Sequence, residues 1–386
     1  MQYRHDKASG NKLSALGFGC MRFPSSMAET EKMILAAIEG GVNYFDTAYI
    51  YPNSEKKLGE VLAKHDKRKY VYIATKLPIS MCRKYEDFDR FFNEQLRRLQ
   101  TDYVDYYFMH NMISLEQWDE VRALGVEKWL AEKKASGQIR HVGFSYHGSG
   151  EEFPKVLDSY AWEFCMIQYN YYDENYQAGK KGLLAAAAKG ISVMIMEPLL
   201  GGRLATGLPQ KAIEMFKTAD PQRTPAEWAL WWLWNQEEVT LLLSGMTSAG
   251  QAEANMLSAE NFRALTAAEL AVFSDVVENF RKSYKVKCTG CNYCLPCPKG
   301  IDIPARLAAY NTSYVQNYKA GIFAYMAGMG ALSEKPIYAR DCNGCGKCEK
   351  LCPQNIEIRK ELKKVSKRFE PLPIRAVLKL ARKFMR

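Results

Sequence analysis

The first 250 residues alternate between short apolar runs and longer stretches in which apolar residues recur at helical spacing. The short runs are rich in β-branched and aromatic residues, which is typical of strands. Eight such runs are present: 16–21, 42–48, 70–77, 104–110, 141–146, 165–170, 191–198 and 239–245. Several of the helical stretches between them end in glycine, as helices commonly do. The pattern therefore predicts a strand–helix unit repeated eight times.

This repeat predicts an α/β fold, a closed (β/α)8 TIM barrel. The runs are continuously apolar rather than alternating, as expected for parallel strands that helices cover on the outside. A doubly wound sheet is the alternative, but no G-x-G-x-x-G motif follows the first run. We assign residues 1–280 to the barrel, with a closing helix over 260–285, and expect reactive groups at the C-terminal ends of its strands.

The eleven cysteines are distributed unevenly along the chain. Cys20, Cys82 and Cys165 are scattered through the barrel, where a lone cysteine is usually a small core residue. The other eight form two runs, Cys288-x2-Cys291-x2-Cys294-x2-Cys297-Pro and Cys342-x2-Cys345-x2-Cys348-x3-Cys352-Pro. The second run has the spacing of bacterial ferredoxins, and the first is one residue shorter in its last gap. The spacing therefore predicts two 4Fe-4S clusters.

The order of the cysteines also predicts which cluster each one binds. In ferredoxin-type runs three cysteines hold one cluster, and the fourth, followed by proline, leads to the other cluster. We assign Cys288, Cys291, Cys294 and Cys352 to one cluster, and Cys342, Cys345, Cys348 and Cys297 to the other. Two structural zinc sites are the alternative, but two four-cysteine runs that both end in Cys-Pro argue against it. The helical segment between the runs predicts a small α-helical ferredoxin-like domain over residues 281–362.

Four polar residues stand where a barrel places its chemistry. Asp46 ends the second predicted strand, Lys76 the third and His110 the fourth, and Tyr51 lies in the loop after the second. Each alone has an ordinary structural explanation, but the ends of adjacent strands bring all four together. A tyrosine gives up its proton reluctantly at neutral pH, since its usual pKa is about 10. A lysine ammonium nearby stabilises the phenolate, an aspartate keeps the lysine charged, and a histidine can orient a carbonyl oxygen.

These residues stand in segments that resemble the aldo-keto reductase family: FDTAYIY, IATKL and DYYFMH. The resemblance implies that Tyr51 is the general acid, that Lys76 and Asp46 tune it, and that His110 orients the substrate. A barrel followed by a ferredoxin-type module is similar to the iron–sulfur subgroup of that family. The expected activity is reduction of a small-molecule carbonyl, or oxidation of an alcohol, with a nicotinamide cofactor.

Further segments resemble the cofactor-binding parts of the family: GFSYH, MIQYN, EPLLGG and SGMTSAGQAEAN. They imply cofactor contacts from Ser145, Gln168, Leu199, Gly201, Gly245, Met246, Gln251 and Asn255. Three positions depart from the pattern: Tyr146 replaces an asparagine, Met196 an aromatic residue, and Gln251 a basic residue. An amide cannot form the charged pair that selects a 2′-phosphate, so both NADH and NADPH remain candidates.

The clusters raise a question of electron count, because nicotinamide moves two electrons as hydride and each cluster moves one. Either the clusters are structural, or they connect to an outside one-electron partner such as a ferredoxin or a flavoprotein; we favour redox function. Two other functions stay open. The chain could be an electron-transfer or regulatory protein whose barrel binds nicotinamide without turnover, or an enzyme driven by ferredoxin electrons. Trp118 and Tyr49 predict an apolar or aromatic substrate mouth.

The net charge of +10 is concentrated at the end of the chain, where residues 363–386 carry nine Lys/Arg and one Glu. This predicts a basic amphipathic tail with an apolar face of Ile374, Val377, Leu378, Ala381, Phe384 and Met385. The tail could contact an acidic ferredoxin or an anionic membrane, but packing on the protein is the simpler expectation, and we expect no nucleic-acid partner. The polar first residues and the lack of a long apolar run predict a cytoplasmic protein.

Overall fold

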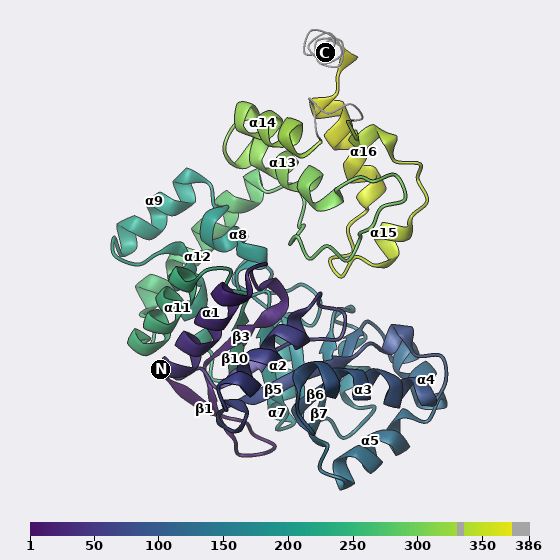
Figure 1. Cartoon of the computed structure of the whole chain (residues 1–386). Helices are drawn as coiled ribbons and strands as arrows, with labels where there is room; N and C mark the ends of the chain where they lie inside the picture. Colours follow the sequence, from purple (N-terminus) through teal and green to yellow (C-terminus); the bar gives the residue numbers. More distant parts are fainter. Residues whose placement is uncertain (330–335, 373–386) are drawn as a thin grey trace. The chain divides into compact units, whose positions relative to one another are not determined.

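The computed structural model describes residues 1–329 and 336–372. All eight predicted runs form strands, and these close into a parallel barrel in the order β10-β3-β4-β5-β6-β7-β8-β9 (Figure 1). The barrel strands are β3 Leu16–Gly19, β4 Tyr44–Asp46, β5 Tyr72–Leu77, β6 Val104–Met112, β7 Ile139–Tyr146, β8 Phe164–Gln168, β9 Ser192–Met196 and β10 Val239–Ser244. The predicted (β/α)8 barrel is therefore confirmed.

Side chains fill the inside of the barrel. Tyr44, Tyr106, Phe108 and Phe164 form one buried cluster with aliphatic residues of the other strands. Tyr106 contacts both Tyr44 and Phe164, with ring centroids 5.2 and 5.1 Å apart. The barrel interior is thus a packed core, which leaves the chemistry to the strand ends.

A short antiparallel hairpin, β1 Tyr3–His5 and β2 Lys12–Ser14, precedes the barrel and was not predicted. Its strands are three residues long and mostly polar, so they lack the apolar signal of the barrel strands. The turn between them carries Asp6, which is buried and accepts hydrogen bonds from Ser192 at 2.5 Å and Tyr106 at 3.0 Å. The hairpin is held to the barrel by these buried polar contacts.

Helices alternate with the barrel strands along the chain. They are α1 Met27–Glu39, α2 Ser54–Lys64, α3 Glu86–Leu99, α4 Leu115–Ala123, α5 Val126–Ala135, α6 Phe153–Leu157, α7 Gly179–Ala188, α10 Pro225–Trp234 and α11 Ala249–Asn261. The remaining helices are α8 Arg203–Thr206, α9 Gln210–Ala219, α12 Ala267–Ser283, α13 Ile303–Val315, α14 Tyr318–Gly328, α15 Lys347–Lys350 and α16 Ile358–Phe369. None of the helices in the described part of the chain is long and apolar enough to span a membrane.

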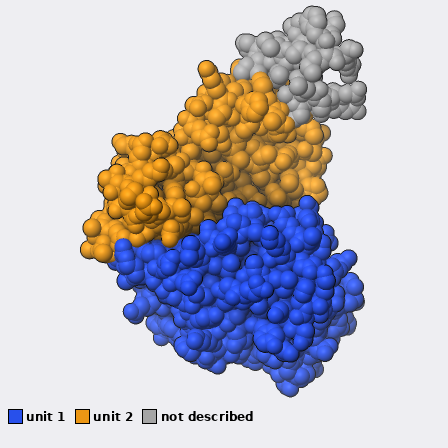
Figure 2. Space-filling model, turned by 60° about the vertical axis from the view of Figure 1, so that its left-hand side comes forward, with its two compact units in different colours: residues 1–198, 229–265 blue, residues 199–228, 266–386 orange. Residues whose placement is uncertain are grey.

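The chain divides into two compact units, which Figure 2 shows in blue and orange. Unit 1 comprises residues 1–198 and 229–265, and unit 2 comprises residues 199–228 and the chain from Thr266 onward. Segment 199–228 joins unit 2 because Phe216 and Trp228 pack against Phe273 of α12, with ring centroids 5.6 and 5.7 Å away. The predicted domain boundaries at residues 280 and 362 do not coincide with these units and remain predictions.

Unit 2 has its own apolar core. Residues of α13, α14 and α16 form it, together with Val286, Ile301 and Cys288. Val365 and Phe369 of α16 are buried in this core, so residues 363–369, which we had placed in the tail, continue the helix of this region. The predicted apolar face from Ile374 to Met385 lies outside the described residues.

Candidate functional site

Lys76 and Asp46 form a buried ion pair at the C-terminal ends of β5 and β4. The lysine Nζ lies 2.6 Å from both carboxylate oxygens of Asp46 and donates a further hydrogen bond of 2.6 Å to the carbonyl oxygen of Thr47. Both side chains are almost fully buried. Asp46 of β4 pairs with Ala74 of β5, and Lys76 lies two residues further along the same strand, so the parallel pairing places the two charged side chains side by side.

Tyr51 and His110 complete a group around this ion pair. The Nζ atom of Lys76 lies 5.2 Å from the centroid of the Tyr51 ring. The ring of His110, in β6, meets the Tyr51 ring edge-on with centroids 5.9 Å apart. The loop residue and the three strand residues named from the sequence therefore lie together at one end of the barrel.

Burial shapes the charges of this group. It lowers the pKa of Lys76 and raises the pKa of Asp46, while the close pairing of the two opposes both shifts. Burial also holds the pKa of His110 well below its usual value, and the nearby Lys76 charge acts in the same direction. At neutral pH His110 is therefore a neutral imidazole, able to donate one hydrogen bond to a substrate oxygen.

A buried hydrogen-bond network around Glu55, which we did not predict, lies behind the ion pair. Glu55 accepts hydrogen bonds from Thr75 at 2.6 Å and Gln95 at 3.0 Å, and Arg98 binds its other oxygen at 3.1 Å. Gln95 also donates to the carbonyl oxygen of Lys76 at 3.0 Å. Arg98 donates to the carbonyl oxygen of Tyr49, also at 3.1 Å. The network thus ties the loop that carries Tyr51 to the strand that carries Lys76.

Ser145 and Gln168, expected to bind the nicotinamide, lie at the ends of neighbouring barrel strands β7 and β8. Both are buried. The Ser145 hydroxyl accepts a hydrogen bond of 2.8 Å from the backbone N–H of Asn111, the residue after His110. Gln168 donates to Asp173 at 3.3 Å. Ser145 is therefore directly connected to the segment that carries His110.

Four further predicted cofactor residues lie where β10 leads into α11. Gly245 is exposed and Met246 is buried, and Asn255 donates a hydrogen bond of 3.0 Å to Ser244. Gln251 folds back on the helix start, because its side-chain oxygen accepts from the N–H and the hydroxyl of Thr247 at 2.8 and 3.1 Å. A helix N-terminus after the eighth barrel strand is a common phosphate-binding arrangement.

The last two predicted cofactor residues, Leu199 and Gly201, belong to unit 2. Their contact with a cofactor bound at the barrel therefore remains a prediction. Gly201 has a φ of +64°, and a Cβ there would collide with the carbonyl oxygen of Thr289. This position therefore requires glycine, and the loop packs directly on the first cysteine run.

One residue near the site lies elsewhere than predicted, and another, His147, was not predicted at all. Trp118 is fully buried and packs against Tyr160 and Trp162, so the prediction that it lines a substrate mouth was wrong. His147, which we did not single out, follows β7 and lies close enough to His110 to lower its pKa. Burial lowers the pKa of His147 itself to about 4. Its position two residues after Ser145, at a strand end, was the available signal.

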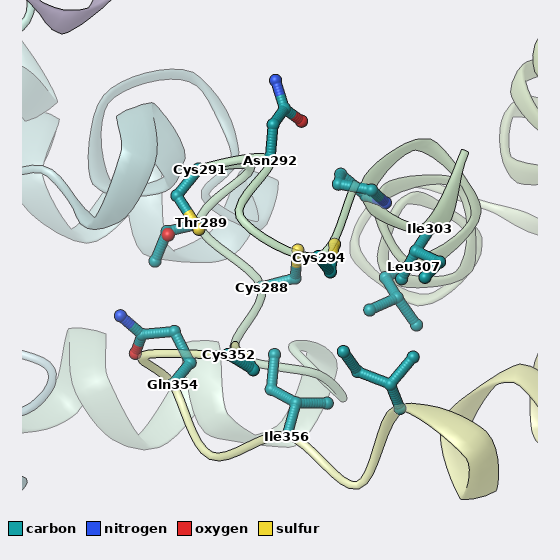
Figure 3. A pocket seen from close by; sticks show the side chains of 12 residues that line it. Cys288, Thr289, Cys291, Asn292, Cys294, Ile303, Leu307, Cys352, Gln354 and Ile356 are labelled. Atoms are coloured by element: carbon teal, nitrogen blue, oxygen red, sulfur yellow. The ribbon is translucent and has the colours of Figure 1, made fainter. Parts of the chain in front are cut away.

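The four cysteines assigned to the first cluster line one pocket in unit 2. Cys288, Cys291 and Cys294 reach it from one loop and Cys352 from a segment far along the chain (Figure 3). Its atom-free space is about 320 Å³, and apolar side chains such as Ile303, Leu307 and Ile356 form much of its wall. Among the described residues, no three His, Cys, Asp or Glu side chains converge tightly enough for a single metal ion.

The surroundings of Cys352 fit a thiolate that binds a cluster. Burial raises the pKa of this thiol, but the backbone N–H groups of Ile356, Gln354 and Asn355 point at its sulfur and oppose that rise. Burial likewise raises the pKa of Cys294 to about 12, with Cys288 and Cys291 adding to the effect. Thiol groups gathered in an apolar pocket with donors aimed at sulfur are the chemistry that 4Fe-4S clusters require.

The cysteines assigned to the second cluster lie at the edge of the same core. Cys297, Cys342 and Cys348 are partly buried against it, and Cys345 is exposed. The Arg359 guanidinium lies near Cys342 and Cys348 and is held by Glu349 at 2.7 Å. Common ligation of one cluster by Cys297 and the other three remains a prediction.

Comparison with known proteins supports both halves of this description. Residues 15–278 match the model of the aldo/keto reductase family, and residues 287–357 match a 4Fe-4S dicluster domain. Morphine 6-dehydrogenase of Pseudomonas putida is 34% identical over 35% of this chain, but the alignment spans only 43% of that enzyme. L-galactose dehydrogenase of Arabidopsis thaliana is 28% identical, over 70% of this chain and 93% of its own length.

Solved structures agree on the fold. An aldo-keto reductase from Bacillus halodurans in its holo form superposes with a TM-score of 0.61, at 24% identity. The match covers 72% of this chain and 96% of that structure. With the family model extending over more than half of the sequence, the protein belongs to the aldo/keto reductase family and carries a C-terminal 4Fe-4S dicluster domain.

Proposed function

We propose that the protein is a nicotinamide-dependent oxidoreductase that reduces a carbonyl to an alcohol, or catalyses the reverse. The observation that carries this proposal is the group formed by the Lys76–Asp46 ion pair, the Tyr51 ring 5.2 Å from the lysine nitrogen, and the edge-on ring of His110. Such a group can supply a proton and orient an oxygen at one place. Membership of an oxidoreductase family agrees with it.

In this proposal the reduced nicotinamide supplies the hydride when bound. Tyr51 donates the proton to the carbonyl oxygen, and the buried Lys76 ammonium stabilises the phenolate that remains. Asp46 keeps Lys76 charged despite its burial. His110, neutral at pH 7, donates a hydrogen bond that orients the carbonyl oxygen without competing as a proton source.

The cofactor would be held by the residues implied by the family resemblance. Ser145 and Gln168 would bind the carboxamide, and the β10–α11 segment with Gly245 and Asn255 would bind the adenine side. The N-terminus of α11 offers backbone N–H groups and a positive dipole end for a phosphate. Gln251, an amide already bound to Thr247, leaves NADH and NADPH both acceptable.

We further propose that the two cysteine sets hold 4Fe-4S clusters that transfer electrons. The pocket lined by Cys288, Cys291, Cys294 and Cys352 supports the first set. Each cluster exchanges one electron whereas nicotinamide exchanges two as hydride, so the pair of clusters needs a one-electron partner outside this chain.

Turnover with Lys76 changed to methionine tests the enzyme assignment. The intact, cluster-loaded protein should consume NADH or NADPH with members of a panel of aldehydes, ketones and sugars. Lys76→Met should lower kcat by about 10²–10⁴-fold, because the phenolate loses its stabilising charge. Lys57→Met, on the exterior helix α2, is the matched control and should change kcat little. Equal turnover in both variants would refute the proposal.

A further inference from the structure

The two cysteine sets differ in exposure. Cys288 of the first set is buried, and its three companions are partly buried. In the second set Cys345 is exposed, and it is the only exposed one of the eleven cysteines, all of which the structure describes. Gly344 and Gly346 flank it, and a Cβ at Gly344 would meet no atom within 4 Å. Among the described residues, Cys345 thus reaches the surface beside Arg359, whose guanidinium lies 3.4 Å from the carbonyl oxygen of Gly344.

The surface around Cys345 combines basic residues with one apolar residue. Lys347 and Lys350 are exposed at the two ends of α15, and Leu351, which follows directly, is 55% exposed. Cys345 and these three residues lie within seven positions of the chain, so they share one local surface. Arg340, two residues before Cys342, is exposed as well. We call Arg340, Lys347, Lys350 and Leu351 the Cys345 patch.

The positive charge of this patch is not neutralised locally. Within residues 1–329 and 336–372, Arg340, Lys347 and Lys350 form no ion pair, whereas the nearby acidic Glu349 is already bound to Arg359. The adjoining helix α16 contacts α15 and adds exposed Lys363 and Lys367, one turn apart and also without an ion pair in the described chain (Figure 1). Over residues 340–367, eight Lys and Arg stand against four Asp and Glu, so the edge of the second cysteine set carries an excess of positive charge, which the negative charge of a thiolate-bound cluster reduces but does not cancel.

We propose that the Cys345 patch is the docking surface for an acidic one-electron carrier protein, of the ferredoxin or flavodoxin kind, which exchanges electrons with the second cluster. The proposal rests on the assignment of clusters under the proposed function. An exposed apolar residue among lysines and an arginine that form no ion pair in the described chain suits a brief encounter steered by opposite charge. Electron-transfer encounters also use small interfaces, which a patch of this size can provide.

The electron balance of the encounter is simple. The reduced carrier is oxidised by one electron, and the second cluster is reduced from its 2+ to its 1+ core. No bond breaks and no proton must move. The exposed Cys345 is the ligand through which the carrier would approach the second cluster, and the more buried first cluster would be the inner partner.

Anaerobic stopped-flow reduction of the full-length, cluster-loaded protein tests this surface. The probe is a reduced acidic 2Fe-2S ferredoxin, mixed with the oxidised protein while the cluster absorbance is followed. A triple variant, Arg340→Glu, Lys347→Glu and Lys350→Glu, should slow the bimolecular rate constant by about 30-fold or more at low salt. Added salt should slow the wild type steeply and the variant little, because screening removes steering that only the wild type has.

Two triple variants with the same change in net charge serve as controls. One changes the exposed lysines Lys32, Lys128 and Lys181 of unit 1 to Glu, and the other changes Arg375, Lys379 and Arg382 of the tail. Both should leave the ferredoxin rate within about threefold of wild type. If the unit 1 control slows as much as the patch variant, net charge alone explains the effect and the proposal fails. If ferredoxin reduces the tail variant more slowly than wild type but reduces the patch variant at the wild-type rate, the carrier docks on the tail and the proposal also fails.

A small reductant separates docking from cluster damage. Reduced methyl viologen is a cation that needs no docking surface, so its rate should be unchanged or rise in the patch variant. Should both reductants slow, with lowered iron and sulfide counts, Lys347→Gln with Lys350→Gln repeats the test without charge reversal. If this variant keeps its iron and sulfide and ferredoxin still reduces it at the wild-type rate, the proposal is contradicted. The proposal is also contradicted if the patch substitutions weaken binding to anionic vesicles but leave the rate of reduction by ferredoxin unchanged. None of these readouts needs carbonyl turnover, so the fate of the Tyr51 proposal is decided separately.

Discussion

At the end of the barrel that carries Lys76, Asp46 and Tyr51, which we call the barrel mouth, hydrogen bonds within the protein hold the reactive groups in place. The first cysteine set, in contrast, lines a pocket whose walls are largely apolar. Lys76 makes three hydrogen bonds to Asp46 and Thr47, and the Glu55–Gln95 network ties its strand to the Tyr51 loop. Cys294 instead faces other thiols and aliphatic side chains, and Cys352 is approached by backbone N–H groups of the residues that follow it. The difference indicates that the catalytic geometry is built into the barrel fold, while the cysteine geometry depends on the cluster it is proposed to hold.

The largest expected effect concerns this dependence on the cluster. Cys352→Ala removes the one ligand that comes from the far end of the chain, so we expect about half of the bound iron to be lost. Unit 2 should then melt at a lower temperature than the barrel, since metal binding and folding are coupled. Iron and sulfide analysis with calorimetry measures both effects. Cys165→Ala, which removes a buried barrel thiol, is the control and should keep the full iron content.

The barrel mouth should respond to its own hydrogen bonds instead. Glu55→Gln places an amide N–H₂ where Arg98 or the donors Thr75 and Gln95 need an acceptor, which should cost about 3 kcal/mol of unfolding free energy. It should also lower kcat by about tenfold, because the Lys76 and Tyr51 segments lose their tie. Glu94→Gln changes the more accessible partner of Arg98, whose side chain is 30% exposed, and should cost less than about 1 kcal/mol. If the two variants lose the same unfolding free energy and the same kcat, the buried Glu55 network does not hold the catalytic residues in position.

Acid should destabilise the barrel mouth through His110. Its folded-state pKa lies well below the usual 6.5, so the unfolded chain binds more protons at low pH and stability falls as the pH drops below that value. The unfolding free energy should therefore fall between pH 7 and pH 5. His110→Gln should remove that part of the pH dependence in urea unfolding, and His5→Gln, in the hairpin, should leave it. If the unfolding free energy of His110→Gln depends on pH as steeply as that of the wild type, His110 is not the group that makes the barrel mouth sensitive to acid.

The smallest effect concerns cofactor choice. Gln251→Arg puts a charge at the start of α11, which should raise the ratio of kcat/KM for NADPH over NADH by about tenfold. Gln117 is a matched control, because it occupies the same position in the cap of α4, three residues after the capping Ser114. Gln117→Arg should leave the ratio unchanged. A ratio that does not respond to Gln251→Arg would place the 2′-phosphate elsewhere.

The elements that the sequence predicted best are those with a strong local signal. The eight barrel strands are continuous apolar runs, and the four catalytic candidates stand at the ends of such runs, so a barrel brings them together. The β1–β2 hairpin lacks that signal because its strands are short and polar. Glu55 and Gln95 also gave none, since a buried carboxylate and amide are recognised only once their partners are known.

Other features depended on long-range packing. Residues 199–228 joined unit 2 through contacts of Phe216 and Trp228 with Phe273, which follows them by 57 and 45 residues, and no local pattern reveals such contacts. Helix α16 extends to Phe369 because Val365 and Phe369 fill the core of unit 2. Trp118 was misplaced for the same reason, since its burial depends on Tyr160 and Trp162.

The central claim is that the Tyr51 phenol, beside the buried Lys76, protonates the carbonyl oxygen during hydride transfer. Single-turnover reduction of an accepted carbonyl by saturating NADH or NADPH tests it most directly, with Tyr51→Phe compared against Tyr49→Phe. The account predicts a hydride-transfer rate lower by about 10²–10⁴-fold in Tyr51→Phe, with cofactor affinity retained, and a near wild-type rate in Tyr49→Phe. A Tyr51→Phe enzyme that transfers hydride as fast as wild type would contradict it.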